Sequence, residues 1–448
     1  MQTQTQTTAF KQWFSDHEDA LLATARDIFA HPELSGEETY SSHRLAQLLE
    51  EAGFRITWGI GGFDTAFLAE WGQGKPILGF LAEYDALPGL GQAPVCHVEP
   101  LSSPGHGCGH NLLGTACAGA AMALKSFLET SVSEPSENCN TFKECTIRVY
   151  GCPAEEIVIG KIRMNKAGVF DDLDVAITWH PFDRNRVSYD IWQAQDVKNY
   201  KFYGKAAHAS KYPELGRSAL DAAELMNVGV NYLREHVADD VRMHYTYTNT
   251  DGPANIVPPY ASTNYFIRST KRSRTEDASS RVDDCARGAA LMTGTRVEIE
   301  VVTSNWEMKT NRPLALAFHK AMERVPLPVY TQKELDFATQ ITKEANLPNP
   351  TDTYFGGLEP LEDEPVPFSI GTDVSDVSHT IPTIMLSAST MCKGTALHHW
   401  ATTAQSGMSI GEKGMLYVAQ CMAEGALDLL KNPQILKDAW EVFHAMGE

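Results

Sequence analysis

The sequence lacks long apolar runs and lacks an excess of positive charge. No uninterrupted apolar stretch approaches the roughly 20 residues that a membrane span requires, so we expect no membrane-spanning helix. The formal net charge at pH 7 is −20, which is the wrong sign for a surface that binds the phosphates of nucleic acid. These absences argue against a membrane protein and against a nucleic-acid-binding protein.

Cysteine is sparse, and its nine copies do not form the dense spacing of a disulfide scaffold. The first ten residues, MQTQTQTTAF, contain neither the basic region nor the apolar core of a secretory signal. We therefore expect a cytoplasmic protein with reduced cysteines, most of them buried as small apolar side chains. The sequence contains no internal repeat.

The chain does contain alternating helical and strand-like patterns. Apolar residues recur at helical spacing over 10–34 and over 37–54. Short apolar runs within 75–89, 145–156 and 173–182 are each followed by polar residues, which is typical of buried strands that end at a functional edge. Strands that alternate with helices predict a wound α/β sheet with the site at its strand ends.

A change of pattern divides the chain. Residues 188–307 are mostly alternating and strand-like, with the helical pattern SALDAAELMNVGVNYLREHV among them, and this predicts an inserted α+β domain. Helix–strand alternation resumes near Pro313. We expect one catalytic domain with a wound mixed sheet, formed by 1–187 and 308–448. The Ser-, Glu- and Asn-rich stretch 129–144 predicts a surface loop.

Five short motifs lie at predicted strand ends or helix starts: EYDALP, GHGCGH, GCPAEE, TWHP and ALHHW. Their thiol, imidazole and carboxylate groups suit Zn²⁺, and also Mn²⁺ or Co²⁺ where oxygen ligands dominate. The adjacent acids Glu155 and Glu156 are the most informative pair, because neighbouring side chains at a strand end point in different directions. One carboxylate can bind metal while the other takes a proton from water, which is the chemistry of amide hydrolysis.

Taken singly, several of these residues allow simpler interpretations. Cys108 could be an inert buried thiol, or a nucleophile with His110 or His106 as its base, although that leaves the Glu155–Glu156 pair without a role. His180 could be an ordinary histidine at a strand end.

The motifs in their order resemble peptidase family M-twenty, the aminoacylase/carboxypeptidase family of dinuclear metallohydrolases. They are HPELSGEET, AEYDALPGL, GHGCGHNLLGTA, GCPAEE, TWHP, GKAAHAS, GPANIVPPYA and ALHHW, and the resemblance runs from about residue 28 to the C-terminus. The amidohydrolase subfamily D, which uses a bridging cysteine, is the most similar. Asn111 in CGHN, and Asp373 and Asp376 in DVSDVS, resemble the B-type group of aminobenzoyl-glutamate utilisation proteins.

The resemblance implies a role for each site residue. Two divalent metal ions, zinc or manganese, would be held by Cys108, His110, Glu156, His180 and His398, with the cysteine as a bridge. Glu155 would be the general base, and Asp85 would fix the orientation of a ligand from behind it. His208 would stabilise the oxyanion in a partner subunit's site, and Asn255 and Arg268 would bind the substrate's carboxylate.

Other histidines near these motifs have less certain roles. In ALHHW, both His398 and His399 compete for the ligand position, and the family's pattern favours His398. His106 fits a turn residue better than a ligand. His379 in DVSHT lies near the site by sequence, but no role follows for it.

The resemblance as a whole implies a metal-dependent amidohydrolase. Its catalytic domain would be phosphorylase/hydrolase-like, and its inserted domain would be ferredoxin-like and serve for dimerisation and as a lid. The expected substrate contains an acyl or aroyl group in amide linkage to an amino acid with a free carboxylate. The leading specific substrate is p-aminobenzoyl-glutamate. A metallo-dipeptidase or an N-acyl amino acid hydrolase of other specificity is the alternative.

The oligomeric state and two alternative classes of protein remain to be considered. We expect a homodimer, with a hetero-oligomer containing a related subunit as the alternative. A non-catalytic metal-binding subunit is a rival from another class, and the intact Glu155 argues against it. A cysteine hydrolase is a second rival, which insensitivity to chelators would favour.

Overall fold

The computed structural model describes residues 2–133, 144–250, 252–348 and 354–447. The chain forms two compact units, which are described separately. Unit 1 comprises Met1–Tyr189, Lys309–Val366 and Val377–Glu448, and unit 2 comprises Asp190–Met308 and Pro367–Asp376.

The segment Pro367–Asp376 packs in unit 2, although the sequence analysis placed it with the catalytic domain. The reason is backbone hydrogen bonding between this segment and residues 191–193, which a local sequence pattern does not predict. The Gln193 amide donates to the Ile370 carbonyl at 2.8 Å, and the Phe368 amide donates to the Ile191 carbonyl at 3.0 Å. Two short strands, β7 (Asp190–Ile191) and β12 (Val366–Pro367), form a separate small sheet.

Unit 1 is built on a seven-stranded sheet in the order β1-β2-β4-β3-β5-β13-β6. The strands are β1 (Arg55–Trp58), β2 (Phe67–Gln73), β3 (Ile77–Glu83), β4 (Cys145–Cys152), β5 (Val175–Phe182), β6 (Arg186–Val187) and β13 (Thr383–Ser389). The four central strands are parallel, whereas β1, β2 and β6 pair antiparallel, so the expected wound mixed sheet is confirmed. Every residue of β3 and β13 is buried, as parallel strands covered on both faces require.

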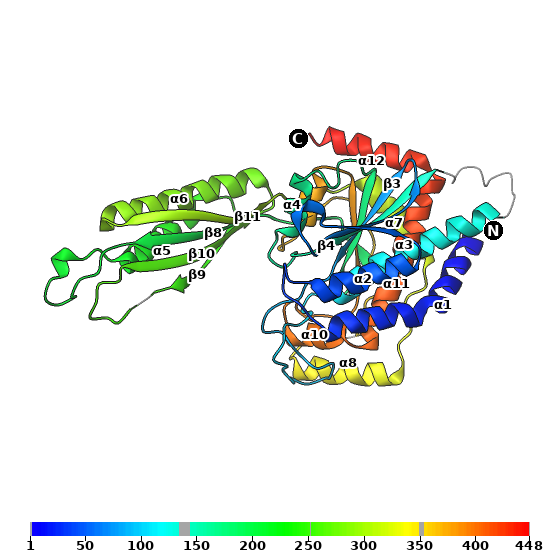
Figure 1. The fold of residues 1–448 in the computed structure, drawn as a ribbon, viewed down its shortest axis with the longest axis horizontal. Coiled ribbons are helices and arrows are strands. Elements are labelled where there is room, and N and C mark those ends of the chain that lie inside the picture. The colour runs from blue at the N-terminus through cyan, green and yellow to red at the C-terminus, as the bar shows by residue number, and fades with distance from the viewer. Residues whose placement is uncertain (1, 134–143, 251, 349–353, 448) are drawn as a thin grey trace. The chain divides into compact units, whose positions relative to one another are not determined.

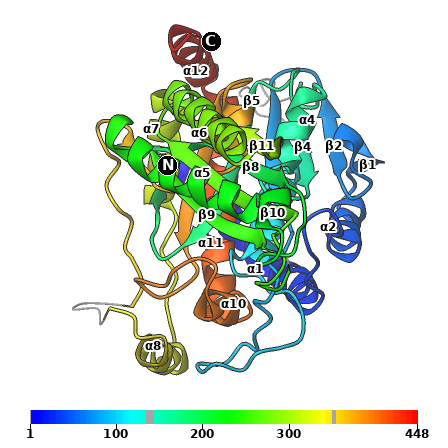
Figure 2. The same cartoon turned by 90° about the vertical axis from the view of Figure 1, so that its left-hand side faces the viewer.

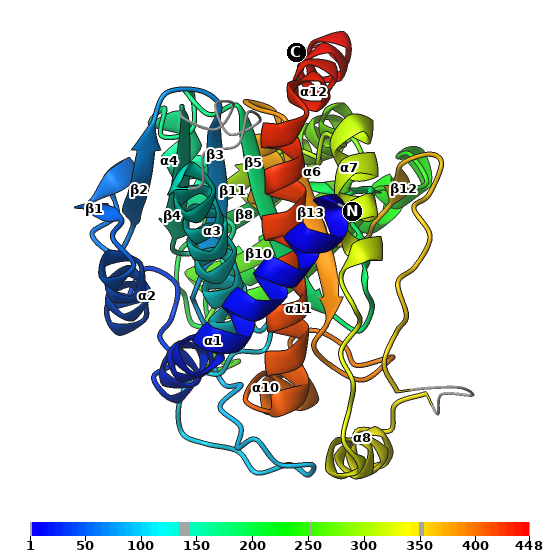
Figure 3. The same ribbon diagram turned by 90° about the vertical axis from the view of Figure 1, so that its right-hand side faces the viewer.

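Unit 1 also contains helices. They are α1 (Gln2–Ala30), α2 (Thr39–Glu51), α3 (His110–Ser133), α4 (Gly160–Lys166), α7 (Arg312–Arg324), α8 (Gln332–Glu344), α10 (Trp400–Ser406), α11 (Ser409–Lys431) and α12 (Pro433–Ala445), and α9 (Val374–Ser378) spans the boundary between the units. Helices α1, α3 and α11 lie together on one face of the sheet (Figures 1 and 3). Part of the loop expected over 129–144 continues α3, and 134–143 lie outside the described residues.

Helix α3 lies in the core of unit 1. Its segment His110–Thr130 is long and apolar enough to cross a membrane by length and composition, but 83% of the apolar window is buried inside the structure. The apolar character therefore serves the core. The Trp179 indole donates to the Leu113 carbonyl at 3.1 Å, which ties β5 to α3. A Cβ added at Gly114 would lie 2.5 Å from the Glu83 carbonyl oxygen, so glycine allows the helix start to approach the end of β3.

Unit 2 has the order strand, helix, strand, strand, helix, strand. Its elements are β8 (Ala194–Tyr203), α5 (Ala219–Leu233), β9 (Arg242–Asn249), β10 (Tyr260–Ser269), α6 (Arg272–Thr293) and β11 (Arg296–Asn305). The antiparallel sheet has the order β11-β8-β10-β9, and both helices pack on it, as Figure 2 shows. This confirms the ferredoxin-like α+β prediction. The sequence analysis did not identify α6, whose polar sequence buries mainly small residues such as Ala278, Val282 and Ala286.

Candidate metal centre

Metal-ligating side chains gather where β3, β4 and β5 end and α3 begins. Their ligand atoms lie within 4.8 Å of one another in three groups, namely Cys108–His110–His180, Cys108–Glu156–His398 and Glu83–His110–Glu155. Because the carboxyl ends of parallel strands meet at one edge of a sheet, residues separated by many positions in the chain converge there. The arrangement offers one thiol, three imidazoles and three carboxylates, a donor set that suits Zn²⁺ or Mn²⁺.

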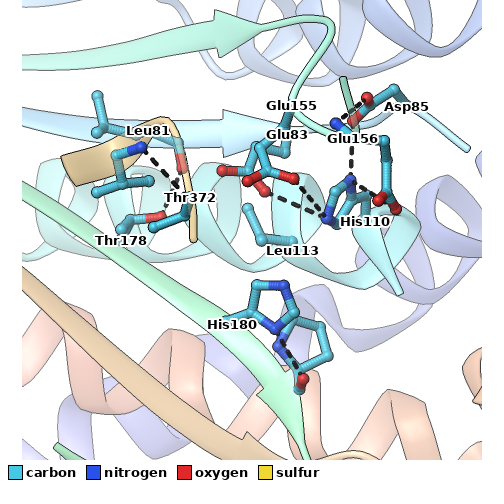
Figure 4. Close-up of polar contacts among 12 residues, drawn as sticks. Leu81, Glu83, Asp85, His110, Leu113, Glu155, Glu156, Thr178, His180 and Thr372 are labelled. Carbon is cyan, nitrogen blue, oxygen red and sulfur yellow. Dashed lines mark hydrogen bonds and ion pairs between the residues drawn. The ribbon is translucent and has the colours of Figure 1, made fainter. Parts of the chain in front are cut away.

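Asp85 holds the ring of His110 in place. The two side chains share a hydrogen bond of 2.8 Å between Asp85 Oδ1 and His110 Nδ1, and both are fully buried. The other oxygen of Asp85 accepts from Ser35 Oγ at 2.8 Å and from the Glu156 amide at 2.9 Å. Burial opposes ionisation of Asp85, but these hydrogen bonds, led by the one from His110, lower its pKa. Because Asp85 contacts Nδ1, Nε2 is the ring nitrogen of His110 that could bind a metal (Figure 4).

The surroundings of His110 are strongly negative. Its Nε2 lies 3.3 Å from Glu83 Oε2 and 3.9 Å from Glu155 Oε2, while Nδ1 lies 3.9 Å from Glu156 Oε1. Burial alone would lower the pKa of His110, but the charge of Glu156 and the hydrogen bond to Asp85 raise it well above its ordinary value. So many buried carboxylates call for bound positive charge.

Three buried polar atoms in this cluster have no hydrogen-bond partner among the described residues, namely Glu83 Oε2, His110 Nε2 and Glu156 Oε1. Buried polar groups are almost always paired with protein atoms, water or an ion. The three atoms belong to residue types that bind divalent metals, and they lie in the groups described above. The residues present therefore fit a metal centre.

The surroundings of His180 favour the neutral form of its imidazole ring. Its Nδ1 makes a 2.8 Å hydrogen bond to the Pro181 carbonyl, which places the proton on Nδ1. Burial lowers the pKa of His180 to about 3, so the ring stays uncharged near neutral pH. A metal-binding histidine requires this state.

Cys108 and His398 lie on adjoining turns. The His398 amide donates to the Gly107 carbonyl at 3.0 Å, and His398 Nε2 lies 3.3 Å from Glu156 Oε2. Burial, and next the charge of Glu156, raises the pKa of the Cys108 thiol well above its usual range. A thiol nucleophile requires a lowered pKa, so these surroundings disfavour the cysteine-hydrolase interpretation and favour a thiolate held by metal.

The neighbouring histidines have structural surroundings. The His399 side chain accepts from the Ala401 amide at 3.3 Å and caps α10. His106 is buried, and its Nε2 lies 3.2 Å from the Ile28 carbonyl. Burial lowers the pKa of His106 to about 4. His379 is in none of the candidate metal groups among the described residues.

Sequence reasoning missed Glu38, which supports the loop that carries the two acids. Glu38 Oε1 accepts from the Ala154 amide at 2.8 Å, and Ala154 has a positive φ of 59°. Oε2 accepts from Thr65 Oγ1 at 3.2 Å. Glu38 stands in the HPELSGEET motif, where no local pattern reveals that it contacts a residue 116 positions away. Glu83 was also missed, although it is the last residue of an otherwise apolar strand, which is a usable signal.

The buried Glu38 predicts a pH effect on stability. Burial, and next the charge of Asp85, raises the pKa of Glu38 to about 7. The folded protein therefore binds an extra proton between about pH 4.5 and 7, and its free energy of unfolding falls as pH rises through that window, by an amount on the order of 3 kcal/mol. Glu38→Gln keeps an oxygen for the Ala154 amide and removes this titration.

The test is chemical unfolding of both proteins at pH 5 and pH 8. The difference in unfolding free energy, wild type minus Glu38→Gln, should fall by about 2–3 kcal/mol from pH 5 to pH 8. Glu50→Gln, on the exposed face of α2, is the matched control and should show no such change. A pH-independent difference for Glu38→Gln would contradict the assignment.

In unit 2, His208 and Asn255 lie on adjoining segments. His208 forms a backbone bridge with Ile256, and the Ala209 amide donates to the Asn255 carbonyl at 3.0 Å. The His208 Nδ1 accepts from the Lys211 amide at 3.3 Å, which leaves the ring proton on Nε2. Both His208 and Asn255 are exposed.

Arg268 lines a different part of unit 2. It borders a cavity of about 340 Å³ whose lining includes Arg242 and His244. The buried Nε of Arg268 has no hydrogen-bond partner among the described residues, and burial lowers its pKa. An incompletely paired guanidinium beside a cavity is suited to a carboxylate ligand.

Comparison with known proteins finds relatives along nearly the whole chain. The chain is 38% identical over 443 residues to the B-type chain of p-aminobenzoyl-glutamate hydrolase from Escherichia coli (strain K12), covering 92% of this chain and 90% of the relative. It is 30% identical over 445 residues to the Xaa-Arg dipeptidase of Mus musculus, covering 95% and 89% respectively. No protein-family model matches the chain.

A solved structure shares the fold. It is that of a Bacillus subtilis protein, a dinuclear metal binding peptidase from the M20 family, with a TM-score of 0.61 at 18% identity. The match covers 93% of this chain and 99% of that chain. Sequence identity along nearly the whole chain and a shared fold lead to one conclusion. The chain belongs to the M20 family of metal-dependent amidohydrolases, with the B-type chain of p-aminobenzoyl-glutamate hydrolase among its relatives.

Proposed function

We propose that this chain hydrolyses the amide bond between an acyl or aroyl group and an amino acid with a free carboxylate, using two divalent metal ions, zinc or manganese. The observation that carries the proposal is the convergence of buried polar atoms without a hydrogen-bond partner among the described residues, which belong to Glu83, His110 and Glu156. The 38% identity to a protein named as a chain of p-aminobenzoyl-glutamate hydrolase supports the same reaction class.

The proposed ligands are Cys108, His110, Glu156, His180 and His398. When bound, the ions would polarise the scissile carbonyl and acidify the attacking water. Asp85 keeps the His110 ring oriented, and Glu155 accepts the proton of the water and returns it to the leaving amine. The buried Glu155 carboxylate lies within 3.9 Å of His110 Nε2, so it is close enough to the ligands to act on water there.

Residues of unit 2 complete the proposal. We assign His208 to stabilise the oxyanion, since its Nε2–H is a donor whose orientation the Lys211 amide sets. Asn255, on the adjoining segment, and Arg268 are assigned to the carboxylate end of the substrate. The inserted unit is assigned the roles of dimerisation domain and lid, on the pattern of the family.

The proposed substrate is p-aminobenzoyl-glutamate, because the relative from Escherichia coli is named for that substrate. A dipeptidase activity is the runner-up, because the Xaa-Arg dipeptidase is also 30% identical along nearly the whole chain. Both substrates offer an amide next to a free carboxylate, so the mechanism is the same for either.

The test measures hydrolysis of p-aminobenzoyl-glutamate and of an Xaa-Arg dipeptide by protein reconstituted with Zn²⁺ or Mn²⁺. We expect turnover of p-aminobenzoyl-glutamate, its loss on chelation, and its recovery when the metal is restored. Turnover of the dipeptide alone would move the proposal to the runner-up substrate. Activity that survives complete metal removal would contradict the mechanism.

We propose a homodimer in the cytoplasm, with a related subunit as the alternative partner. The exposed face of α5 carries Leu225, Val228 and Tyr232, which are 39%, 50% and 71% exposed and recur at helical spacing. Light scattering should give a dimeric mass that Val228→Glu shifts to the monomer. Val329→Glu, at an exposed apolar position of unit 1, is the matched control and should stay dimeric. A monomeric wild type would contradict the homodimer.

A further inference from the structure

A buried ion pair beside the metal centre has no role in the mechanism proposed above. Lys161 Nζ lies 2.6 Å from Glu83 Oε1, and the two side chains are 0% and 2% exposed. Lys161 comes from α4, and Glu83 is the last residue of β3. A buried ion pair is weak as a source of stability, because the cost of removing both charges from water offsets their attraction. The pair therefore calls for another explanation.

The second oxygen of Glu83 is directed at the ligand nitrogen of His110. Glu83 Oε2 lies 3.3 Å from His110 Nε2, and neither atom has a hydrogen-bond partner among the described residues. Because Asp85 occupies Nδ1, Nε2 is the nitrogen left for a metal. Two ligands that each lie about 2.1 Å from one tetrahedral ion are separated by roughly 3.4 Å. The observed spacing fits two ligands of the same ion.

The two carboxylates near this nitrogen differ in distance and support. Glu155 Oε2 is 3.9 Å from His110 Nε2, which is 0.6 Å farther than Glu83 Oε2. Figure 4 shows both carboxylates approaching the same ring nitrogen, while Asp85 and Glu156 approach the other one. Lys161 holds Glu83 by one oxygen and balances its charge, which leaves the other oxygen fixed in direction. Glu83 is thus arranged to bind a metal ion, and Glu155 remains available to accept a proton from water.

We propose that Glu83 is a further ligand of the metal ion held by His110, and that Lys161 fixes this carboxylate for binding. The inference rests on the proposed function, since it requires that the centre bind metal. It adds an oxygen donor beside His110, in the candidate group that also contains Glu155. An added oxygen donor raises the coordination number and improves the fit of harder ions such as Mn²⁺.

The test measures metal binding without substrate, using metal-free full-length protein titrated with Co²⁺ and followed by calorimetry and visible absorption. The variants are Glu83→Gln and the double variant Glu83→Gln/Lys161→Met, which leaves no unpaired charge and so separates ligand loss from misfolding. We expect wild type to bind two ions, and both variants to bind one of them at least about 10–100-fold more weakly with a changed Co²⁺ spectrum.

Glu424→Gln is the matched control, because Glu424 is a buried, ion-paired carboxylate from α11 that is in none of the candidate groups among the described residues. It should bind both ions as the wild type does. A double variant with wild-type Co²⁺ affinity and spectrum would overturn the inference and leave Glu83 only a partner for Lys161. A wild type that binds no metal would instead overturn the proposed function, and this inference with it.

Discussion

Glu155→Gln is expected to lower the rate of amide hydrolysis by about 10²–10⁴-fold while both metal ions still bind. The amide is nearly isosteric with the carboxylate, so the packing of this buried residue should be preserved. The amide cannot accept the proton of the attacking water, and that step is the role proposed for Glu155. The loss should appear in kcat, because binding of substrate does not require this proton transfer.

The neighbouring acid supplies the contrast for this prediction. Glu156→Gln should lose activity together with bound metal, because Glu156 Oε2 lies 3.3 Å from His398 Nε2 in one of the candidate groups. Steady-state kinetics and metal analysis of both variants therefore separate a base from a ligand. If Glu155→Gln keeps near wild-type kcat, or loses its metal as Glu156→Gln does, Glu155 is not the general base.

Cys108→Ala is expected to remove both metal ions and reduce hydrolysis below detection. Cys108 belongs both to the group with His180 and to the group with His398, so one substitution removes a donor from each. Burial raises the pKa of this thiol, so the thiolate persists only where a cation stabilises it. Metal content after dialysis, measured with turnover, checks the prediction.

A second buried cysteine provides the control. Cys421 is buried in α11 and is in none of the candidate groups among the described residues. Cys421→Ala removes the same volume from a core site and should keep both metals and wild-type turnover. Retention of two ions by Cys108→Ala would show that the cysteine does not bridge them.

The extent of sequence-based prediction differed between the two units. In unit 1, short apolar runs followed by polar residues identified β3, β4 and β5, because buried parallel strands leave this pattern locally. In unit 2, α6 was not identified, since its buried face uses small residues such as Ala286 within a polar sequence. The packing of 367–376 in unit 2 depends on backbone pairing with 191–193, which composition does not encode.

The sequence by itself determined the residue types at the strand ends, their order along the chain, and therefore the class of chemistry. It could not determine which atoms meet. Only the tertiary structure placed Asp85 on Nδ1 of His110, and Nε2 near Glu83 and Glu155. It alone joined Glu38 to Ala154, and Lys161 to Glu83. The physical reason is that burial, hydrogen bonding and charge act through space, and these partners become neighbours only when the chain folds.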